Sequence, residues 1–342
     1  MPKGDAAALT GDGGRDMLQL GEAKGKWREK WGMVVRAIVL GVVASFFFAF
    51  TFVLNRAMDL AGGSWIWSSS LRYLFMVPFL LAIVWLRGNL RPLWREMGAR
   101  PWAWLVWSFV GFGLFYGPLS FAAAYGPGWL IAGTWQVTIV AGSLLVPFLG
   151  QKIPYKGLVV SLIILAGVAM MQMEHAKALG VKEALYGIVP VVVAAFAYPL
   201  GNRKMMEITR GRLDAYQRVL GMTLASIPLW LLLAVWGAAA EGLPSVSQTV
   251  QSLIVAVTSG IVATVLFFQA TDLSKGSPGR MAAVEATQAG EVVFAVLLEV
   301  LLLSAPLPGA WSWAGMLLVV GGMALHSRVS HEKESACQPI EK

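Results

Sequence analysis

The longest uncharged stretch of the chain sets the strongest limit on its fold. Residues 101–151 contain no Asp, Glu, Lys, Arg or His. A helix needs about 20 mainly apolar residues to cross a bilayer, so this stretch is too long for one membrane span and too short for three. The turn residues "YGPG" at 125–128 interrupt it. We therefore expect two membrane helices joined by a tight turn.

The remainder of the chain continues this pattern and predicts an all-α integral membrane protein. Only 13% of the 342 residues are charged, about half the share in a soluble domain. The single cysteine, Cys337, excludes a disulfide framework. Ten apolar segments have the length of a membrane helix. They are residues 33–55, 64–86, 101–123, 128–149, 156–173, 183–201, 215–238, 247–270, 279–303 and 308–327.

The positions of the Lys and Arg residues predict the orientation of these spans. Of the 27 basic residues, twenty-one fall on one side of the membrane, three on the other side and three within spans. Under the positive-inside rule the rich side is cytoplasmic. The polar leader 1–32 and the tail 328–342 are then both predicted to lie in the cytoplasm. The spans are expected in the inner (plasma) membrane. Because basic loops explain the net charge of +8, nucleic acid is not an expected partner.

A short motif occurs twice, about 147 residues apart. "AFTFVLNRAM" (49–58) closes the first span, and "AFAYPLGNRKMM" (195–206) closes the sixth. Weaker matches follow in the same order: "LRYLFM" (71–76) with "QRVLGM" (217–222), and "GPGWL" (126–130) with "SPGRM" (277–281). We predict two five-helix repeats, residues 33–173 and 183–327. Since five is odd, the second repeat must be inverted, which is typical of alternating-access transporters.

These features resemble the drug/metabolite transporter superfamily, in particular its EamA-like branch and the bacterial multidrug resistance efflux transporter family. The resemblance covers about residues 35–327 and rests on the ten spans in two halves and on "AFAYPLGNRKMM". EamA-like repeats often place a Glu just after the fourth span of a repeat. Here Gln151 stands near that position in the first repeat and Glu299 in the second, so only the second repeat keeps the Glu. The resemblance implies secondary transport, by export, through a cavity between the halves.

Three acids lie well inside the predicted spans, all in the ninth: Glu285, Glu291 and Glu299. An intramembrane carboxylate is costly and marks a candidate functional site. Helical spacing places Glu285, Gln288 and Glu299 on one face, with Glu291 on its flank. We expect Glu285 to bind either a proton or a cationic substrate, so that Glu285→Gln abolishes proton-linked transport.

Alternatively, these acids have a structural role and form buried ion pairs with Arg72 and Arg218, two arginines inside spans. Asn55 and Asn202 are expected to cap or end their helices, with their neighbouring arginines at opposite interfaces. The alternative is a functional role, in which the Asn-Arg pairs gate the transport path by exchanging their contacts. Tyr198 of the repeated motif would take part in this gating.

The fourth span and the end of the third supply further candidates for the substrate site. Polar groups and aromatic faces that could meet a cation or a flat ligand are expected from Thr134, Trp135, Gln136 and Tyr116.

The sequence favours a proton-coupled exporter of small cationic or amphipathic compounds, with a small-molecule substrate and the bilayer as partners. No cofactor, metal or obligate protein partner is expected. The two arginines permit amino acids or related metabolites as an alternative cargo. An intramembrane lipid-modifying enzyme is disfavoured, because the three histidines fall at span ends or in the tail and no HExxH or GxSxG motif occurs.

The predicted orientation can be tested by tag accessibility. Tags placed in residues 87–100 and in residues 203–212 should be protected from an external reagent in intact cells and become reactive together after permeabilisation, because both loops are basic. Finding the two loops on different sides of the membrane would contradict the inverted repeat.

Overall fold

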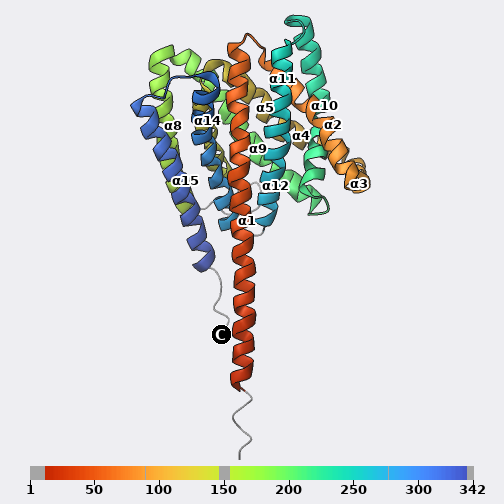
Figure 1. The fold of residues 1–342 in the computed structure, drawn as a ribbon, viewed down its shortest axis with the longest axis vertical. Coiled ribbons are helices and arrows are strands. Elements are labelled where there is room, and N and C mark those ends of the chain that lie inside the picture. Colours follow the sequence, from red (N-terminus) through yellow and green to blue (C-terminus); the bar gives the residue numbers. More distant parts are fainter. Residues whose placement is uncertain (1–11, 89, 146–154, 276, 337–342) are drawn as a thin grey trace, which may run out of the picture.

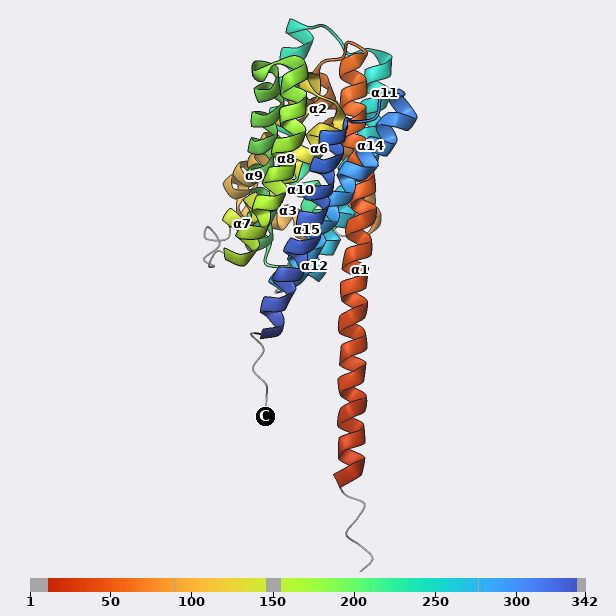
Figure 2. The ribbon, with the colours of Figure 1, turned by 90° about the vertical axis from the view of Figure 1, so that its left-hand side faces the viewer.

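The computed structural model describes residues 12–88, 90–145, 155–275 and 277–336, and the regular structure in these residues is entirely helical. The predicted all-α class is confirmed. The long helices lie side by side along one axis, and the amino-terminal part of α1 projects from one end of the bundle (Figures 1 and 2). The carboxyl end of α15 points towards the same end.

The first half of the chain contains the following elements: α1 (Asp12–Leu60), α2 (Trp65–Leu86), α3 (Leu90–Ala99), α4 (Pro101–Ser108), η1 (Phe109–Gly113), α5 (Leu114–Ala122), η2 (Ala123–Tyr125), α6 (Gly128–Trp135), α7 (Val137–Leu144) and α8 (Tyr155–Leu179). The second half contains α9 (Val181–Thr209), α10 (Ala215–Ala240), α11 (Val246–Val255), η4 (Ala256–Ala263), α12 (Thr264–Leu273), α13 (Pro278–Ala286), η5 (Thr287–Ala289), α14 (Gly290–Leu303) and α15 (Ala310–Ala336).

Seven helical stretches of the described residues are long and apolar enough to cross a membrane. They are Gly32–Leu60, Trp65–Leu86, Pro101–Tyr125, Val181–Thr209, Ala215–Ala240, Val246–Leu273 and Ala283–Leu303. Two shorter apolar stretches, Leu162–Glu174 and Ala310–Leu325, fall in the predicted fifth and tenth spans. The predicted fourth span is broken into α6 and α7, and its end lies outside the described residues. The ten-span repeat stays a prediction.

The first and sixth spans run further than the sequence suggested. Helix α1 continues to Leu60 and α9 to Thr209, so Asn55 and Asn202 lie inside helices and are buried. The expectation that they cap these helices is therefore wrong. An Asn side chain ends a helix only where it competes for local backbone groups. Asn55 instead bonds to side chains of the third predicted span.

Two kinds of irregularity recur in both halves. The π-helical segments η1 and η4 interrupt the third and eighth predicted spans. A turn at Gln136 separates α6 from α7, and the 3₁₀ segment η5, which contains Gln288, separates α13 from α14. Such interruptions expose or redirect backbone and occur often at functional sites. They bring two glutamines to the middle of their broken helices.

The helices of the two halves pack against one another. Helix α2 contacts α10, α8 contacts α15, α1 contacts α12 and α14, and α9 contacts α5 and α7. Small residues allow the closest approaches, as is usual between membrane helices. A methyl group added at Gly201 of α9 would overlap the backbone of Gly111 in η1.

The end of the bundle from which α1 projects carries polar contacts between the predicted cytoplasmic loops. Arg212 donates two hydrogen bonds to the Glu96 carboxylate, at 2.6 and 2.9 Å. These bonds hold the pKa of Glu96 below its usual range. Arg100 donates to the carbonyl oxygen of Ile208 at 3.2 Å. The loops on either side of these contacts are therefore neighbours, as a shared side of the membrane requires, while the side itself stays a prediction.

Close packing at Gly201 predicts a stability difference between two glycine substitutions. Gly201→Ala should lower the free energy of unfolding by about 1–3 kcal/mol, because its methyl group must push apart two backbones. Gly117→Ala is the matched control, since a methyl group there meets no atom within 4 Å. Thermal unfolding of the detergent-purified variants measures both. Equal melting temperatures would contradict the close contact.

Candidate functional site

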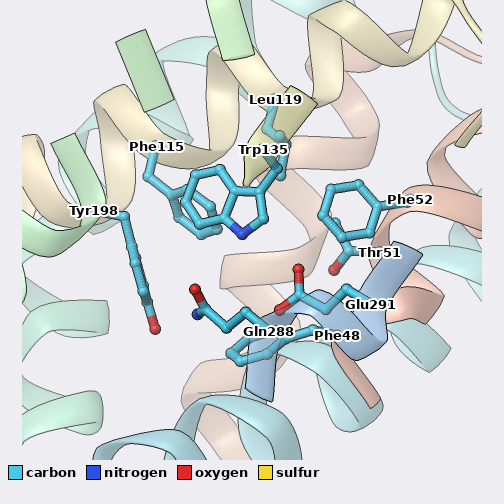
Figure 3. A pocket seen from close by; sticks show the side chains of 9 residues that line it. All are labelled: Phe48, Thr51, Phe52, Phe115, Leu119, Trp135, Tyr198, Gln288 and Glu291. Atoms are coloured by element: carbon cyan, nitrogen blue, oxygen red, sulfur yellow. The ribbon is translucent and has the colours of Figure 1, made fainter. Parts of the chain in front are cut away.

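A small cavity of about 10 Å³ lies at the meeting point of α1, α5, α6, α9 and the broken helix α13–η5–α14. Its walls are mainly aromatic, with one carboxylate (Figure 3). The lining residues are Phe48, Thr51, Phe52, Phe115, Leu119, Trp135, Tyr198, Gln288 and Glu291. None of these lining residues is basic, so the charge of the cavity is set by Glu291.

Glu291 stands at the start of α14, directly after the 3₁₀ segment, and is only 1% exposed. Its carboxylate points into the cavity next to the Trp135 indole (Figure 3). The Gln136 side chain lies next to this carboxylate. The second oxygen, Oε2, has no hydrogen-bond partner among the described residues. A buried carboxylate in this condition needs a proton or a cation to offset its charge.

Aromatic rings make up most of the cavity wall around the carboxylate (Figure 3). The ring centroid of Phe115 lies 4.6 Å from that of Tyr198 and 5.1 Å from that of Trp135. Phe48 and Phe52 of α1 complete the wall (Figure 3). Aromatic faces attract cations within about 6 Å of the ring centroid. Together with Glu291 they form an environment suited to an organic cation.

A second cavity of about 30 Å³ adjoins the first and shares Tyr198 and Gln288 with it. Its walls include Thr138, Asn202, Arg203, Thr271 and Glu285.

The charged groups of the second cavity hold each other. Arg203 donates to Glu285 at 2.8 Å and to the carbonyl oxygen of Gly142 at 2.7 Å. The two neighbouring cavities thus differ in charge, with an ion pair in the second and an unpaired carboxylate oxygen in the first.

The predicted pairing of the ninth-span acids with Arg72 and Arg218 is wrong. Arg218 pairs with Asp272 of α12, at 2.7 Å. Arg72 donates to the Thr51 hydroxyl at 3.2 Å, and its guanidinium lies 3.9 Å from the centroid of the Tyr116 ring. Apolar spans give no sequence signal for which helix faces which, so the partners could not be chosen beforehand.

Glu299 lies away from both cavities. Its carboxylate accepts hydrogen bonds from the backbone N–H groups of Gly128 and Trp129, at 2.7 and 3.1 Å, at the start of α6. The expected single face of Glu285, Gln288 and Glu299 is therefore wrong, because η5 interrupts the regular helix between them. A 3₁₀ turn advances each residue by about 120° instead of 100°. This change places Gln288 and Glu291 on the same cavity.

The structure brings together part of the predicted set. The predicted residues that line a cavity are Trp135, Tyr198, Asn202, Glu285, Gln288 and Glu291, with Gln136 next to Glu291. The predicted residues that line neither cavity are Asn55, Arg72, Tyr116, Thr134, Arg218 and Glu299.

The residues in this second group have partners elsewhere. The Tyr116 hydroxyl donates to the side-chain oxygen of Asn55 at 3.2 Å. The Thr134 hydroxyl donates to the carbonyl oxygen of Leu130 at 2.8 Å and accepts a hydrogen bond from Gln172.

The sequence reasoning missed the contribution of α1. Phe48, Thr51 and Phe52 line the first cavity, and the last two belong to the repeated motif "AFTFVLNRAM". The repeated motif was the one sequence feature that could have indicated a role for these residues. Arg203 was expected at a membrane interface but faces the second cavity. In the described residues, no group of three or more His, Cys, Asp or Glu side chains could hold a metal ion.

The Arg203–Glu285 pair should be energetically coupled. Both side chains are less than 20% exposed (17% and 19%), so a double-mutant cycle with Ala at each position should give a coupling energy of about 1–3 kcal/mol. The neighbouring pair Lys204–Glu207 is the control, because Glu207 is 60% exposed and such pairs give less than about 1 kcal/mol. Unfolding free energies in detergent measure both cycles, and equal coupling would count against a special role for Arg203.

Comparison with known proteins adds the following matches. The family model described as "EmrE: Putative multidrug resistance efflux transporter" matches residues 35–332. "Uncharacterized protein YjlA" of Bacillus subtilis (strain 168) is 58% identical over 313 residues, which are 88% of this chain and 97% of that protein. The "Uncharacterized 42.1 kDa protein in intracellular alkaline protease 3'region" of Shouchella clausii is 50% identical over 270 residues, 76% of this chain and 71% of that protein.

A solved structure titled "Crystal structure of protein" is among those that share the fold. It aligns with a TM-score of 0.62 over 87% of this chain and 98% of its own, at 16% sequence identity.

Proposed function

Because the chain belongs to the EmrE family of multidrug resistance efflux transporters, we propose that it exports small organic cations in exchange for protons by alternating access. The observation that carries the proposal is Glu291, a buried carboxylate with an unpaired oxygen in a cavity walled by aromatic rings. A cation and a proton compete for such a group, and their opposite movements are coupled if the protein changes its open side only when the group is occupied.

Glu291 is a better candidate than Glu285 for the group shared by proton and substrate. Glu285 already receives a charged hydrogen bond from Arg203, so an incoming cation would have to displace that arginine. Glu291 has no basic side chain in its cavity. We therefore assign exchange to Glu291 and the role of a closing contact to the Arg203–Glu285 pair.

The packing of the helices supports an inverted repeat. Exchanging the halves turns the contact of α1 with α12 into that of α9 with the third predicted span, and the contact of α1 with α14 into that of α9 with α7. The pairs α2–α10 and α8–α15 map onto themselves. The π-helical segments η1 and η4 also occupy corresponding places. On this proposal ten helices in two inverted halves enclose one shared path.

Two contacts on the broken helix α13–η5–α14 would close that path at its opposite ends. Arg203 holds Glu285 of α13, and the start of α6 holds Glu299 of α14. The 3₁₀ segment between them is the natural hinge, because its hydrogen bonds are weaker than those of an α-helix. Release of one contact while the other holds would open the path to one side only.

The charge of the cavities favours cations over the alternative cargo of amino acids or related metabolites. Arg72 and Arg218 line neither cavity. A carboxylate-bearing substrate would thus find only Arg203, which is already paired. We also propose that the protein lies in the inner membrane with both termini in the cytoplasm, as the basic loops indicate.

The proposal is tested by comparing three acid-to-amide variants in an exporter-deficient host exposed to a panel of cationic drugs. Glu291→Gln should abolish resistance and drug-induced proton efflux from everted vesicles, because an amide cannot exchange a proton. Glu285→Gln should reduce the rate but retain coupling. Glu207→Gln, at an exposed position, is the control and should behave as the native chain. Native proton coupling in Glu291→Gln, with all variants equally folded by size-exclusion chromatography, would overturn the proposal.

A further inference from the structure

Three buried oxygen atoms on the cavity walls have no hydrogen-bond partner among the described residues. They are Oε2 of Glu291, the hydroxyl of Tyr198 and Oδ1 of Asn202, on side chains that are 1%, 4% and 5% exposed. Tyr198 lines both cavities, Glu291 the first and Asn202 the second. Buried polar atoms in folded proteins are nearly always paired, and a ligand bound in the two cavities would supply partners for these three.

The chemistry of these atoms specifies what would satisfy them. A carboxylate oxygen and an amide oxygen accept hydrogen bonds, and a phenolic hydroxyl both accepts and donates. The wall of the second cavity offers Arg203 as a donor, but Arg203 is engaged with Glu285 and Gly142. A ligand that satisfies all three orphan oxygens must therefore carry N–H or O–H donors.

The space beside Glu291 adds an independent limit. The first cavity measures about 10 Å³, which is about one water-sized sphere. A primary ammonium head has nearly the size of a water molecule, whereas a trimethylammonium head is several times larger. The small head therefore requires less widening of this cavity than the trimethylammonium head does.

We infer that the ligand of the two cavities is an organic ammonium ion with N–H donors, a primary or secondary amine in its protonated form, and that Tyr198 and Asn202 select it against fully alkylated ammonium ions. The inference rests on the proposed function, because it names the substrate class of the same site. Aromatic rings attract both kinds of cation. Discrimination therefore falls to the three oxygens, which a fully alkylated head leaves buried and unpaired.

A matched pair of ligands tests the inference. The probes are protonated 2-phenylethylamine and its N,N,N-trimethyl derivative, which share the aromatic body and the charge and differ in N–H donors and head size. Dissociation constants are measured by isothermal titration calorimetry on the full chain in detergent, at about pH 8, where an alkylamine is still protonated. The native chain should bind the primary amine about ten-fold more tightly or better.

Substitutions that remove one of the three oxygens should reduce the preference for the primary amine over its trimethyl derivative. Tyr198→Phe and Asn202→Leu should each weaken amine binding by about five-fold or more, while binding of the trimethyl derivative is unchanged or improved. Tyr186→Phe on the same helix is the control, because Tyr186 is exposed and lines neither cavity.

Each result bears on a separate claim. Equal binding of the two probes, or tighter binding of the trimethyl derivative, would overturn the inference and leave the proposed exchange at Glu291 standing. A preference that Tyr198→Phe and Asn202→Leu leave intact would also overturn it. If neither probe binds the native chain, or if Glu291→Gln binds both as the native chain does, the proposed function fails as well.

Discussion

The structure depends on the burial of one carboxylate at membrane depth. Moving a charge away from water is costly unless a partner offsets it, and Glu291 has no basic side chain in its cavity. On our proposal, this group therefore holds either a proton or a cation. The aromatic wall of Phe115, Trp135 and Tyr198 provides a surface that a cation can contact without bringing water along.

The breaks in the membrane helices, more than the regular helices, determine the surroundings of this carboxylate. The turn at Gln136 and the 3₁₀ segment Thr287–Ala289 break two membrane helices at the level of the cavities. Non-helical backbone at this depth is tolerated where it is enclosed by protein. The close contact of Gly111 with Gly201 brings α9, and with it Tyr198, against the third span. Helix α9 thus carries both the close packing contact, at Gly201, and a cavity residue, Tyr198.

Much of the fold could be predicted from the sequence, because the bilayer limits the choice to helices of known length and the basic residues mark one set of loops. The acids of the ninth span could be found for the same reason. Their partners could not. Arg203 and Arg72 face helices that no apolar pattern identifies. The turn of η5 places Glu291 on the first cavity, whereas the sequence predicted it on the flank of a face shared by Glu285 and Glu299. The contribution of Thr51 was visible only as a repeated motif of unknown purpose.

Proton release on ligand binding tests the central claim most directly, since it needs no membrane and no transport. Purified protein in weakly buffered detergent solution is titrated with protonated 2-phenylethylamine while a pH dye records free protons. Competition at Glu291 predicts the release of about one proton per bound cation below the pH at which the site is already deprotonated, and none from Glu291→Gln. Binding by the native chain without proton release, or equal release from Glu291→Gln, would contradict the account.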